Sequence, residues 1–287
     1  MTAELAVIVP CYNSNPVFLE EALASLSLAA APFDCQKLVV DDGSKDASTL
    51  QSIATAAGFE YLRKPNGGLA SARNFGVQYT DSRYLSFCDD DDRVFGNKYE
   101  LQLAAMNHRP EAVSYTGSQW FDDAGAIEPF QYFTSEEVEE RLMYGNLFHV
   151  NSVLLSRQQF DTVNGFDESL PMLEDWDFWL RLQLAGFSFQ GMPTICSEVR
   201  VHPGQMSQNR ERMNRYMATV CEKYAHRFED FPGDVDQQRA YRFASAWATY
   251  MQNSDQQSWR GWFKFTRIHI GQLATLALWV KKKIWRS

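Results

Sequence analysis

Short apolar runs alternate with amphipathic segments along the first third of the chain. Leu5–Val9 is continuously apolar, which is typical of a parallel strand buried on both faces. Residues 16–30 repeat leucines at helical spacing, behind a favourable helix start at Asn15 and Pro16. The same reasoning predicts strands over 37–41, 59–62 and 84–88, and helices over 46–57 and 69–79. This alternation predicts an α/β fold with a mostly parallel central sheet, whose ligands bind at the carboxyl ends of the strands.

The pattern is less regular after about residue 100. It predicts strands over 113–121, 152–155 and 194–200, and a helix over 175–185 that Gly186 ends. From about residue 210 onward the pattern is helical only. We therefore expect the α/β domain to occupy residues 1–205 and a helical extension to occupy residues 206–287.

Composition narrows the class of protein. The chain has 287 residues with 45% hydrophobic content, enough for one large globular domain and an appendage. Its five cysteines form no CxxC pair, which argues against a zinc ribbon or a disulfide framework and favours buried thiols in a reducing compartment. The N-terminal segment lacks a basic region, and no apolar run reaches the length of a membrane span. We expect a cytoplasmic protein.

The net charge of −9 is distributed unevenly. Residues 256–287 contain no acidic side chain and carry +7, so the rest of the chain carries −16. Leu273, Leu276 and Val280 repeat there at helical spacing beside basic residues and tryptophans, which suits an anionic membrane surface. The alternative is a helix packed on the α/β domain with a solvated basic end. The acidic body argues against nucleic acid as a partner, so we expect peripheral contact with the inner face of the cell membrane.

Four consecutive aspartates, Asp89–Asp92, follow the apolar run at 84–88. Carboxylates crowded at a strand end repel one another unless a positive group lies among them. In an extended chain Asp89 and Asp91 point to the same side, and such a pair suits a hard divalent cation, Mg²⁺ or Mn²⁺, that also binds phosphate oxygens. The alternative is a solvated acidic turn.

Two further segments suit a nucleotide. Asp41 ends a predicted strand, where an acid is well placed to accept a hydrogen bond from a ribose hydroxyl or a base N–H; the alternative is an Asp-Gly turn. Residues 66–74 place two glycines before a predicted helix, so that backbone can approach a ligand and the helix N-terminus favours an anion. Arg73 adds a donor fork one turn into that helix; the alternative is a plain loop with a surface arginine.

An acidic cluster opens the helix predicted over 175–185. The helix dipole alone favours Glu174, Asp175 and Asp177 at that place. The functional interpretation is that one of them is a general base, which takes the proton from an attacking hydroxyl. Glu174 and Asp175 are the two candidates that we retain.

Together these segments resemble the family 2 glycosyltransferases, which have the GT-A fold. The resemblance rests on AVIVPCYN, VVDDGSKD, NGGLASARNFGV, SFCDDDDRVFGNKYE and SVLLSRQQFDTVNGFDESLPMLEDWDFWLRL, which occur in the family's order over roughly the first 200 residues. It implies an inverting transfer of a sugar from a nucleotide-diphosphate donor, with UDP as the expected nucleotide, to a hydroxyl of a glycan or lipid-linked acceptor. It also implies Mn²⁺ or Mg²⁺ as cofactor, and a place in the synthesis of cell-envelope or exported polysaccharide or glycolipid.

The resemblance also assigns roles in nucleotide binding. The loop beside the base would contain Pro10, Tyr12 and Asn13. Asp41 would contact the base or the ribose, and Arg73 would be a basic contact to the nucleotide. Asp89 would be the first aspartate of a DxD pair. Residues 1–100 would form the nucleotide-sugar half of a catalytic domain 1–205, and residues 101–205 its acceptor half.

Metal and catalytic roles follow in the same way. The DxD pair Asp89 and Asp91 would bind the metal, with support from Asp92. His202 would touch the metal or the diphosphate from a late loop, with a plain loop role as the alternative. Asp175 would be the catalytic base, with Glu174 beside it.

The sequence also departs from the family pattern. Asp90 occupies a position where many relatives have a small or uncharged residue, so which aspartates bind metal stays open. The absence of a QxxRW motif and of several membrane spans disfavours the processive branch of the family. Two alternatives remain: an inactive relative that binds sugar nucleotides as a scaffold, and a sugar-nucleotide pyrophosphorylase, which would carry a basic glycine-rich loop where this chain has residues 10–14.

Overall fold

The computed structural model of the chain describes residues 3–206 and 209–224. The chain forms two compact units, a larger one of residues 1–139 and 146–203 and a smaller one made of the rest. The amphipathic segment predicted within residues 256–287 lies outside the described residues. Within the described parts, no helix combines the length and the apolar character that crossing a bilayer requires.

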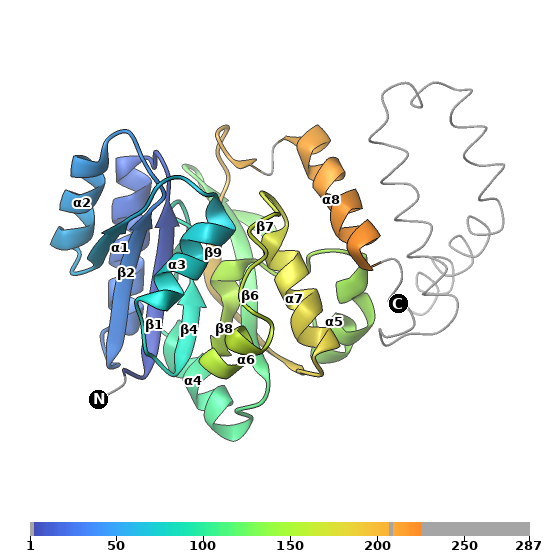
Figure 1. Cartoon of the computed structure of the whole chain (residues 1–287). Helices are drawn as coiled ribbons and strands as arrows, with labels where there is room; N and C mark the ends of the chain where they lie inside the picture. Colours follow the sequence, from blue (N-terminus) through green and yellow to red (C-terminus); the bar gives the residue numbers. More distant parts are fainter. Residues whose placement is uncertain (1–2, 207–208, 225–287) are drawn as a thin grey trace, which may run out of the picture. The chain divides into compact units, whose positions relative to one another are not determined.

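Four parallel strands form the first half of the central sheet (Figure 1). They lie in the order β3 (Glu60–Arg63), β2 (Cys35–Asp41), β1 (Leu5–Cys11) and β4 (Tyr84–Phe87). β1 and β2 pair over their whole length, so their carboxyl ends at Cys11 and Asp41 lie side by side. Every residue of β1 and β4 is buried, as expected of strands covered on both faces.

Helices cover both faces of these strands. They are α1 (Pro16–Ala30), α2 (Ala47–Ala56) and α3 (Leu69–Gln78), close to the bounds predicted from the sequence. α1 begins as predicted, because the Asn15 side chain accepts a hydrogen bond from the N–H of Val17 at 3.0 Å. α1 packs on one face of β1, and α3 packs on the Ile8 side of the same strand (Figure 1). A β-carbon on Gly76 of α3 would lie 2.6 Å from a methyl group of Ile8, so this close approach requires glycine.

The second half of the sheet is mixed. Beyond β4 the order continues through β8 (Val153–Ser156), β6 (Val113–Asp122), β9 (Phe189–Arg200) and β5 (Arg93–Val94), while β7 (Gly125–Gln131) pairs with β6. β8 is antiparallel to both β4 and β6, so β6 and its parallel neighbour β9 run in the direction of β4. The carboxyl ends of β1, β2, β4, β6 and β9 therefore lie along one edge of the sheet.

Several short elements have no clear periodicity in the sequence. They are the strands β5 and β7, the helices α4 (Lys98–His108), α5 (Ser135–Arg141) and α6 (Arg157–Thr162), and two single-turn 3₁₀ helices, η1 (Leu142–Tyr144) and η2 (Val150–Ser152). α6 begins with a capping box formed by Ser156 and Gln159, which is a signal that the sequence does contain. α8 (Arg210–Tyr224) belongs to the smaller unit and agrees with the helical pattern from residue 210.

Aromatic contacts fix α7 (Glu174–Leu184) against the sheet. Phe178 of α7 stacks on Phe166 with ring centroids 4.4 Å apart, and Phe166 packs edge-on against Phe87 of β4 at 5.1 Å. Such buried ring pairs contribute about 0.5–1.5 kcal/mol each beyond the area they bury. The N-terminus of α7 is therefore held at a defined place relative to β4.

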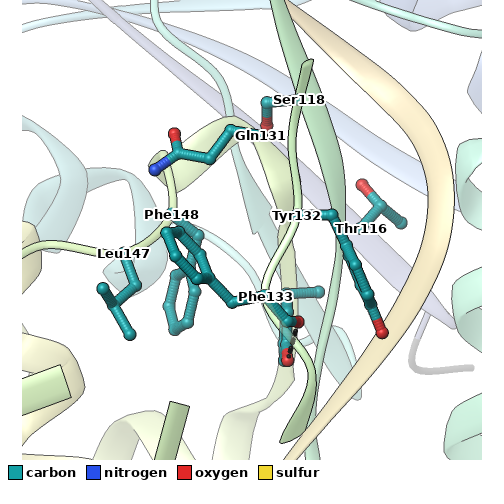
Figure 2. Close-up of a pocket in the computed structure, with 8 residues that line it drawn as sticks. Thr116, Ser118, Gln131, Tyr132, Phe133, Leu147 and Phe148 are labelled. Atoms are coloured by element: carbon teal, nitrogen blue, oxygen red, sulfur yellow. Dashed lines mark hydrogen bonds between the residues drawn. The ribbon is translucent and has the colours of Figure 1, made fainter. Parts of the chain in front are cut away.

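A tight stack of rings lies against β6 (Figure 2). Tyr115 stacks on Tyr132 and on Phe148, with ring centroids 6.2 Å and 4.8 Å apart. Its hydroxyl donates to the carbonyl of Phe133 at 2.7 Å. The hollow that these side chains line leaves no space for a water molecule, so it is packed core rather than a ligand pocket. Phe148 also contacts Trp179 of α7 at 5.4 Å, which anchors the segment around Phe148.

A lysine side chain lies inside the core of the larger unit. Lys98 is fully buried at the start of α4, where its Nζ donates to Oε1 of Gln102 at 2.7 Å. Because burial disfavours the charged form, the pKa of Lys98 falls to about 7. Burying this amine therefore lowers the free energy of unfolding most below pH 7, where the amine is charged in both the folded and the unfolded protein. The loss becomes smaller as the pH rises from about 7 toward the ordinary lysine pKa.

We expect Lys98→Met to raise the free energy of unfolding by about 1–3 kcal/mol at pH 6, because removing the buried charge outweighs the loss of its hydrogen bonds to Gln102 and Ser86. The gain should shrink at pH 9, where the folded wild-type amine is neutral. Urea denaturation at both pH values measures the difference, with the exposed lysine variant Lys45→Met as control. Equal effects at the two pH values would contradict a buried amine with a lowered pKa.

Candidate active site

Predicted site residues gather at the edge formed by the carboxyl ends of the strands. Asp41 ends β2 and Asp89 follows β4 at this edge. The N-terminus of α7 lies at the same place, because Arg73 contacts both Asp89 and Glu174. In open α/β sheets this edge is where ligands bind, so the contacts define a candidate active site.

Arg73 joins the two acidic parts of the site. Its side chain is only 1% exposed and donates to Oε1 of Glu174 at 2.5 Å and to Oδ1 of Asp89 at 2.7 Å. The guanidinium also lies over the ring of Phe166, 5.2 Å from the ring centroid. The predicted contact between Arg73 and a nucleotide stays a prediction, since the observed partners are two carboxylates.

Asp41 is buried and engaged by its neighbours. Its carboxylate accepts hydrogen bonds from the Tyr61 hydroxyl at 2.6 Å, the Arg63 guanidinium at 3.0 Å and the N–H of Ser44 at 2.8 Å. Burial alone would raise the pKa of Asp41, but the hydrogen bonds from Ser44 and Tyr61 and the charge of Arg63 lower it below its usual value. These contacts tie the ends of β2 and β3 together, and a contact of Asp41 with a base or ribose stays a prediction.

The side chain of Asp42, which follows β2, lies in the glycine loop before α3. Its carboxylate accepts hydrogen bonds from the N–H groups of Gly67 at 2.9 Å and Gly68 at 2.7 Å, and from Nζ of Lys64 at 2.7 Å. Gly68 has a φ of 92°, which glycine adopts without strain. The anion at this helix N-terminus is thus a side chain of the protein, a contact that the sequence did not reveal.

The loop after β1 contains an exposed aromatic ring. Pro10 is buried within the strand, and Asn13 is tied to the loop after β2, where its N–H donates to Oγ of Ser44 at 2.8 Å. Tyr12 and Asn13 are both exposed, and Tyr12 is 54% exposed. Of the three residues predicted beside the nucleotide base, Tyr12 has an exposed aromatic ring that could stack on a base, and this role stays a prediction.

The acidic segment is a turn rather than an extended strand end, which corrects the geometry expected from the sequence. β4 ends before the aspartates, and Asp90 and Asp91 occupy a turn. As a result, the Asp89 carboxylate contacts Arg73, whereas Asp91 contacts Nε2 of His202 at 2.8 Å. The two carboxylates therefore have different partners.

Arg200 and Asn151 hold both ends of this turn. The buried Asp92 carboxylate accepts a hydrogen bond from the N–H of Arg200 at 2.7 Å and another from Nδ2 of Asn151. Oδ1 of Asn151 accepts from the N–H of Asp89 at 2.9 Å. Nε of Arg200 donates to the carbonyl of Asp91 at 2.8 Å. These contacts preorganise the turn before any ligand binds.

Burial and mutual repulsion raise the pKa values of the acidic turn. Burial raises the pKa of Asp90 to about 7, and the neighbouring Asp91 adds to the shift. Burial is also the largest cause of the raised pKa values of Asp91 and Asp92, again with contributions from neighbouring aspartates. Carboxylates with raised pKa values mark a place where a bound cation would be stabilised.

Asp91 and His202 present a carboxylate oxygen and an imidazole nitrogen in contact, a donor set that fits a divalent cation. Among the residues that the structure describes, no three His, Cys, Asp or Glu side chains come together as a ready-made metal cage. Mg²⁺ and Mn²⁺ bound beside phosphates commonly use only one or two protein carboxylates, because the substrate completes the coordination. The residues present therefore fit a cation that is shared with a diphosphate.

Glu174 and Asp175 open α7 and differ in their contacts. Glu174 is buried against Arg73; burial raises its pKa to about 7, and the arginine charge opposes that shift. Asp175 is half-buried and accepts a hydrogen bond from Nδ2 of Asn146 at 2.6 Å. Burial also raises the pKa of Asp175, against the lowering effects of Arg73 and Asn146. Because Arg73 occupies Glu174, Asp175 is the carboxylate more open to a substrate hydroxyl.

Sequence reasoning did not identify Asn146, Asn151 or Arg200. Asn151 directly precedes a segment that carries the family resemblance, and Arg200 ends a predicted strand two residues before His202. Their positions next to the family segment and to His202 were the only indication in the sequence that Asn151 and Arg200 lie near the site. Asn146 lies in a segment without periodicity and offers no signal of its own.

The parallel strands, the acidic turn after β4 and the carboxylates that open α7 place this domain in the GT-A class of α/β folds. Solved structures of other proteins share it. A fragment of TarS from S. aureus in complex with UDP-GlcNAc gives a TM-score of 0.66 at 15% identity, covering 94% of this chain and 81% of that one. The mannosyltransferase PcManGT from Pyrobaculum calidifontis, in complex with GDP-Man and Mn²⁺, gives a TM-score of 0.65 at 15% identity, covering 100% and 88%. At these identities the likeness shows the fold, and the fold predicted from the sequence is confirmed.

Sequence comparison then gives the family. Residues 6–156 match the family described as glycosyl transferase family 2. The chain belongs to this family, and the enzyme class that this membership defines is the glycosyltransferases.

Individual relatives are similar over most of this chain. The putative teichuronic acid biosynthesis glycosyltransferase TuaG of Bacillus subtilis is 26% identical over 72% of this chain and 82% of its own length. An uncharacterized glycosyltransferase of Rickettsia bellii is 29% identical over 76% of this chain and 33% of its own length. This chain spans between 33% and 65% of the length of the Rickettsia relatives that it matches.

Proposed function

We propose that this chain transfers a sugar from a UDP-sugar donor to a hydroxyl of a glycan or lipid-linked acceptor, with inversion at the anomeric carbon. Family membership supports the reaction class. The likeness to TuaG supports a role in cell-envelope polysaccharide synthesis. The UDP-GlcNAc complex of TarS supports UDP as the nucleotide, and the GDP-Man complex of PcManGT makes GDP the alternative.

The observation that carries this proposal is the double contact of Arg73. One guanidinium binds Asp89 of the acidic turn and Glu174 of α7, with Asp175 next in the chain. The candidate donor site and the candidate base are thereby held next to each other, as sugar transfer requires.

The donor side of the mechanism uses the acidic turn. Asp91 and His202 would hold Mn²⁺ or Mg²⁺, with Asp89 meeting the ribose or the same ion. When bound there, such an ion would supply the positive charge that offsets the charge of the leaving diphosphate. Tyr12 would stack on the base, while Asn13 and Asp41 would line the base or ribose subsite. Arg200 and Asn151 keep the turn in shape throughout, since both hold its backbone.

The acceptor side uses the start of α7. Asp175 would take the proton of the attacking hydroxyl, and Asn146 fixes its carboxylate for that role. Arg73 neutralises Glu174 beside it, which keeps a second buried charge from competing. Attack on the face opposite the leaving diphosphate inverts the anomeric configuration.

We extend the proposal to the organisation of the chain. Residues 1–100 would bind the nucleotide sugar and residues 101–205 the acceptor, with residues 206–287 as a helical extension. The basic segment 256–287 would touch the anionic inner face of the cell membrane, where a lipid-linked acceptor is available.

Calorimetric titration with UDP, GDP, TDP and CMP, each with and without Mn²⁺, tests the donor site. We expect UDP to bind at least about tenfold more tightly when Mn²⁺ is present, because the ion offsets repulsion between the diphosphate and the acidic turn. Preferential binding of GDP would change the donor class. If no nucleotide binds in either condition, the proposed donor site is wrong. Binding without UDP release from UDP-sugars in the presence of acceptors would favour an inactive scaffold.

A further inference from the structure

The side chain of Asn146 lies against the candidate base with a defined orientation. Its Nδ2 donates to Oδ2 of Asp175 at 2.6 Å. An ionised carboxylate only accepts hydrogen bonds, so the amide must turn its NH₂ group toward Asp175. That requirement fixes where the amide oxygen, Oδ1, lies.

Oδ1 of Asn146 is buried and has no hydrogen-bond partner among the residues that the structure describes. Buried polar atoms in native proteins almost always have a partner, and leaving one unpaired is costly. Because Asn146 lies beside the candidate base, a partner supplied by the substrate is the simplest explanation.

The residues that directly follow Asn146 are packed in the core. Phe148, two residues further on, packs on Tyr115 and on Trp179, with ring centroids 4.8 Å and 5.4 Å apart. Leu147 is buried as well. This packing fixes the backbone directly after Asn146 near α7, and the hydrogen bond to Asp175 orients the amide itself.

We propose that Asn146 is a positioning residue that selects acceptors with two neighbouring hydroxyls, as in a sugar ring or a polyol. One hydroxyl passes its proton to Asp175 and attacks, while the adjacent hydroxyl donates a hydrogen bond to Oδ1 of Asn146. The geometry suits this pairing because the nitrogen and oxygen of an amide are attached to the same carbon. The amide oxygen of Asn146 therefore lies close to the carboxylate of Asp175 that its nitrogen contacts, at a spacing that suits hydroxyls on adjacent carbons. This inference rests on the proposed function and adds the substrate class.

The test compares an acceptor with its deoxy analogue. Methyl glycosides of glucose, galactose and N-acetylglucosamine, together with ribitol, serve as acceptor probes with a saturating UDP-sugar and Mn²⁺. The best probe is then compared with the analogue that lacks the neighbouring hydroxyl. For the wild type we expect kcat/KM to be about ten- to a hundredfold higher with the diol, because the deoxy analogue leaves Oδ1 of Asn146 unpaired.

Asn146→Leu keeps the size of the side chain and removes the amide. The ratio of kcat/KM for the diol to kcat/KM for the deoxy analogue should therefore fall to about 1. Asn146→Ala repeats the measurement in case leucine disturbs folding. Asn107→Leu, at an exposed position of α4, is the matched control and should keep the wild-type preference. UDP binding measured by calorimetry verifies that each variant retains the donor site.

The outcomes separate this inference from the proposed function. If Asn146→Leu slows transfer to both acceptors equally and the preference persists, Asn146 only orients Asp175 and the inference is overturned. If the wild type transfers sugar to none of the probes, the proposed function itself is contradicted, and the inference with it. Loss of the preference in both Asn146 variants with intact UDP binding supports it.

Discussion

Replacing Asp175 with asparagine is expected to lower kcat by about 10²–10⁴-fold with little change in donor affinity. Asparagine keeps the size of the side chain but cannot take a proton from the acceptor hydroxyl. The candidate donor contacts lie at Asp89, which contacts Arg73, and at Asp91, which contacts His202, rather than at Asp175. Initial rates of UDP release from a saturating UDP-sugar give kcat, and calorimetry with UDP and Mn²⁺ gives the donor affinity.

The pH dependence gives an independent check on Asp175. Burial raises its pKa above the ordinary aspartate value, and a base works only when deprotonated. The wild-type rate should therefore fall as the pH falls through that raised pKa, and Asp175→Asn should lose this acidic limb. Asp161→Asn, the same change at an exposed position of α6, should leave both rate and profile unaltered. An unchanged kcat in Asp175→Asn would move the base to Glu174.

Replacing Asp91 with alanine is expected to lower kcat by about 10³-fold and to remove most of the dependence of UDP binding on Mn²⁺. Asp91 contributes the carboxylate of the candidate metal pair, and the substitution leaves His202 without that carboxylate beside it. Titration of Mn²⁺ into the UDP-bound protein measures ion affinity directly, apart from activity.

Two further variants make the result on Asp91 interpretable. Asp91→Asn keeps the size of the side chain and one oxygen ligand but removes the negative charge, so it should lie between the wild type and Asp91→Ala. Asp123→Ala removes an exposed aspartate from the turn between β6 and β7 and should change neither measurement. Wild-type activity in Asp91→Ala would show that Asp91 does not bind the metal.

Local sequence patterns predicted the first half of the fold because its signals are local. The apolar run at Leu5–Val9 is buried on both faces, and Asn15 caps α1 as its position before Pro16 indicates. The second half was harder. α4 buries Lys98 and Gln102 among its apolar residues, which hides the amphipathic pattern.

The candidate site shows the same division. Asp89–Asp92, Arg73 and Asp175 were recognisable because several charged residues follow apolar strands or open helices in the family's order. The contacts that these residues make could not be predicted from the sequence. The extended geometry expected for the aspartates was wrong. Local spacing cannot distinguish a strand end from a turn that is held by Asn151 of η2 and Arg200 of β9.

By itself, the sequence determined the α/β fold, the family and the residue types that can bind a nucleotide, a cation and a proton. Only the tertiary structure decided which of these residues meet. Arg73 binds Glu174 across 101 positions of sequence, and Asn146 reaches Asp175 across 29. Such long-range contacts form because parallel strands and packed aromatic rings place distant segments at one edge of the sheet, and no local pattern in the chain records that proximity.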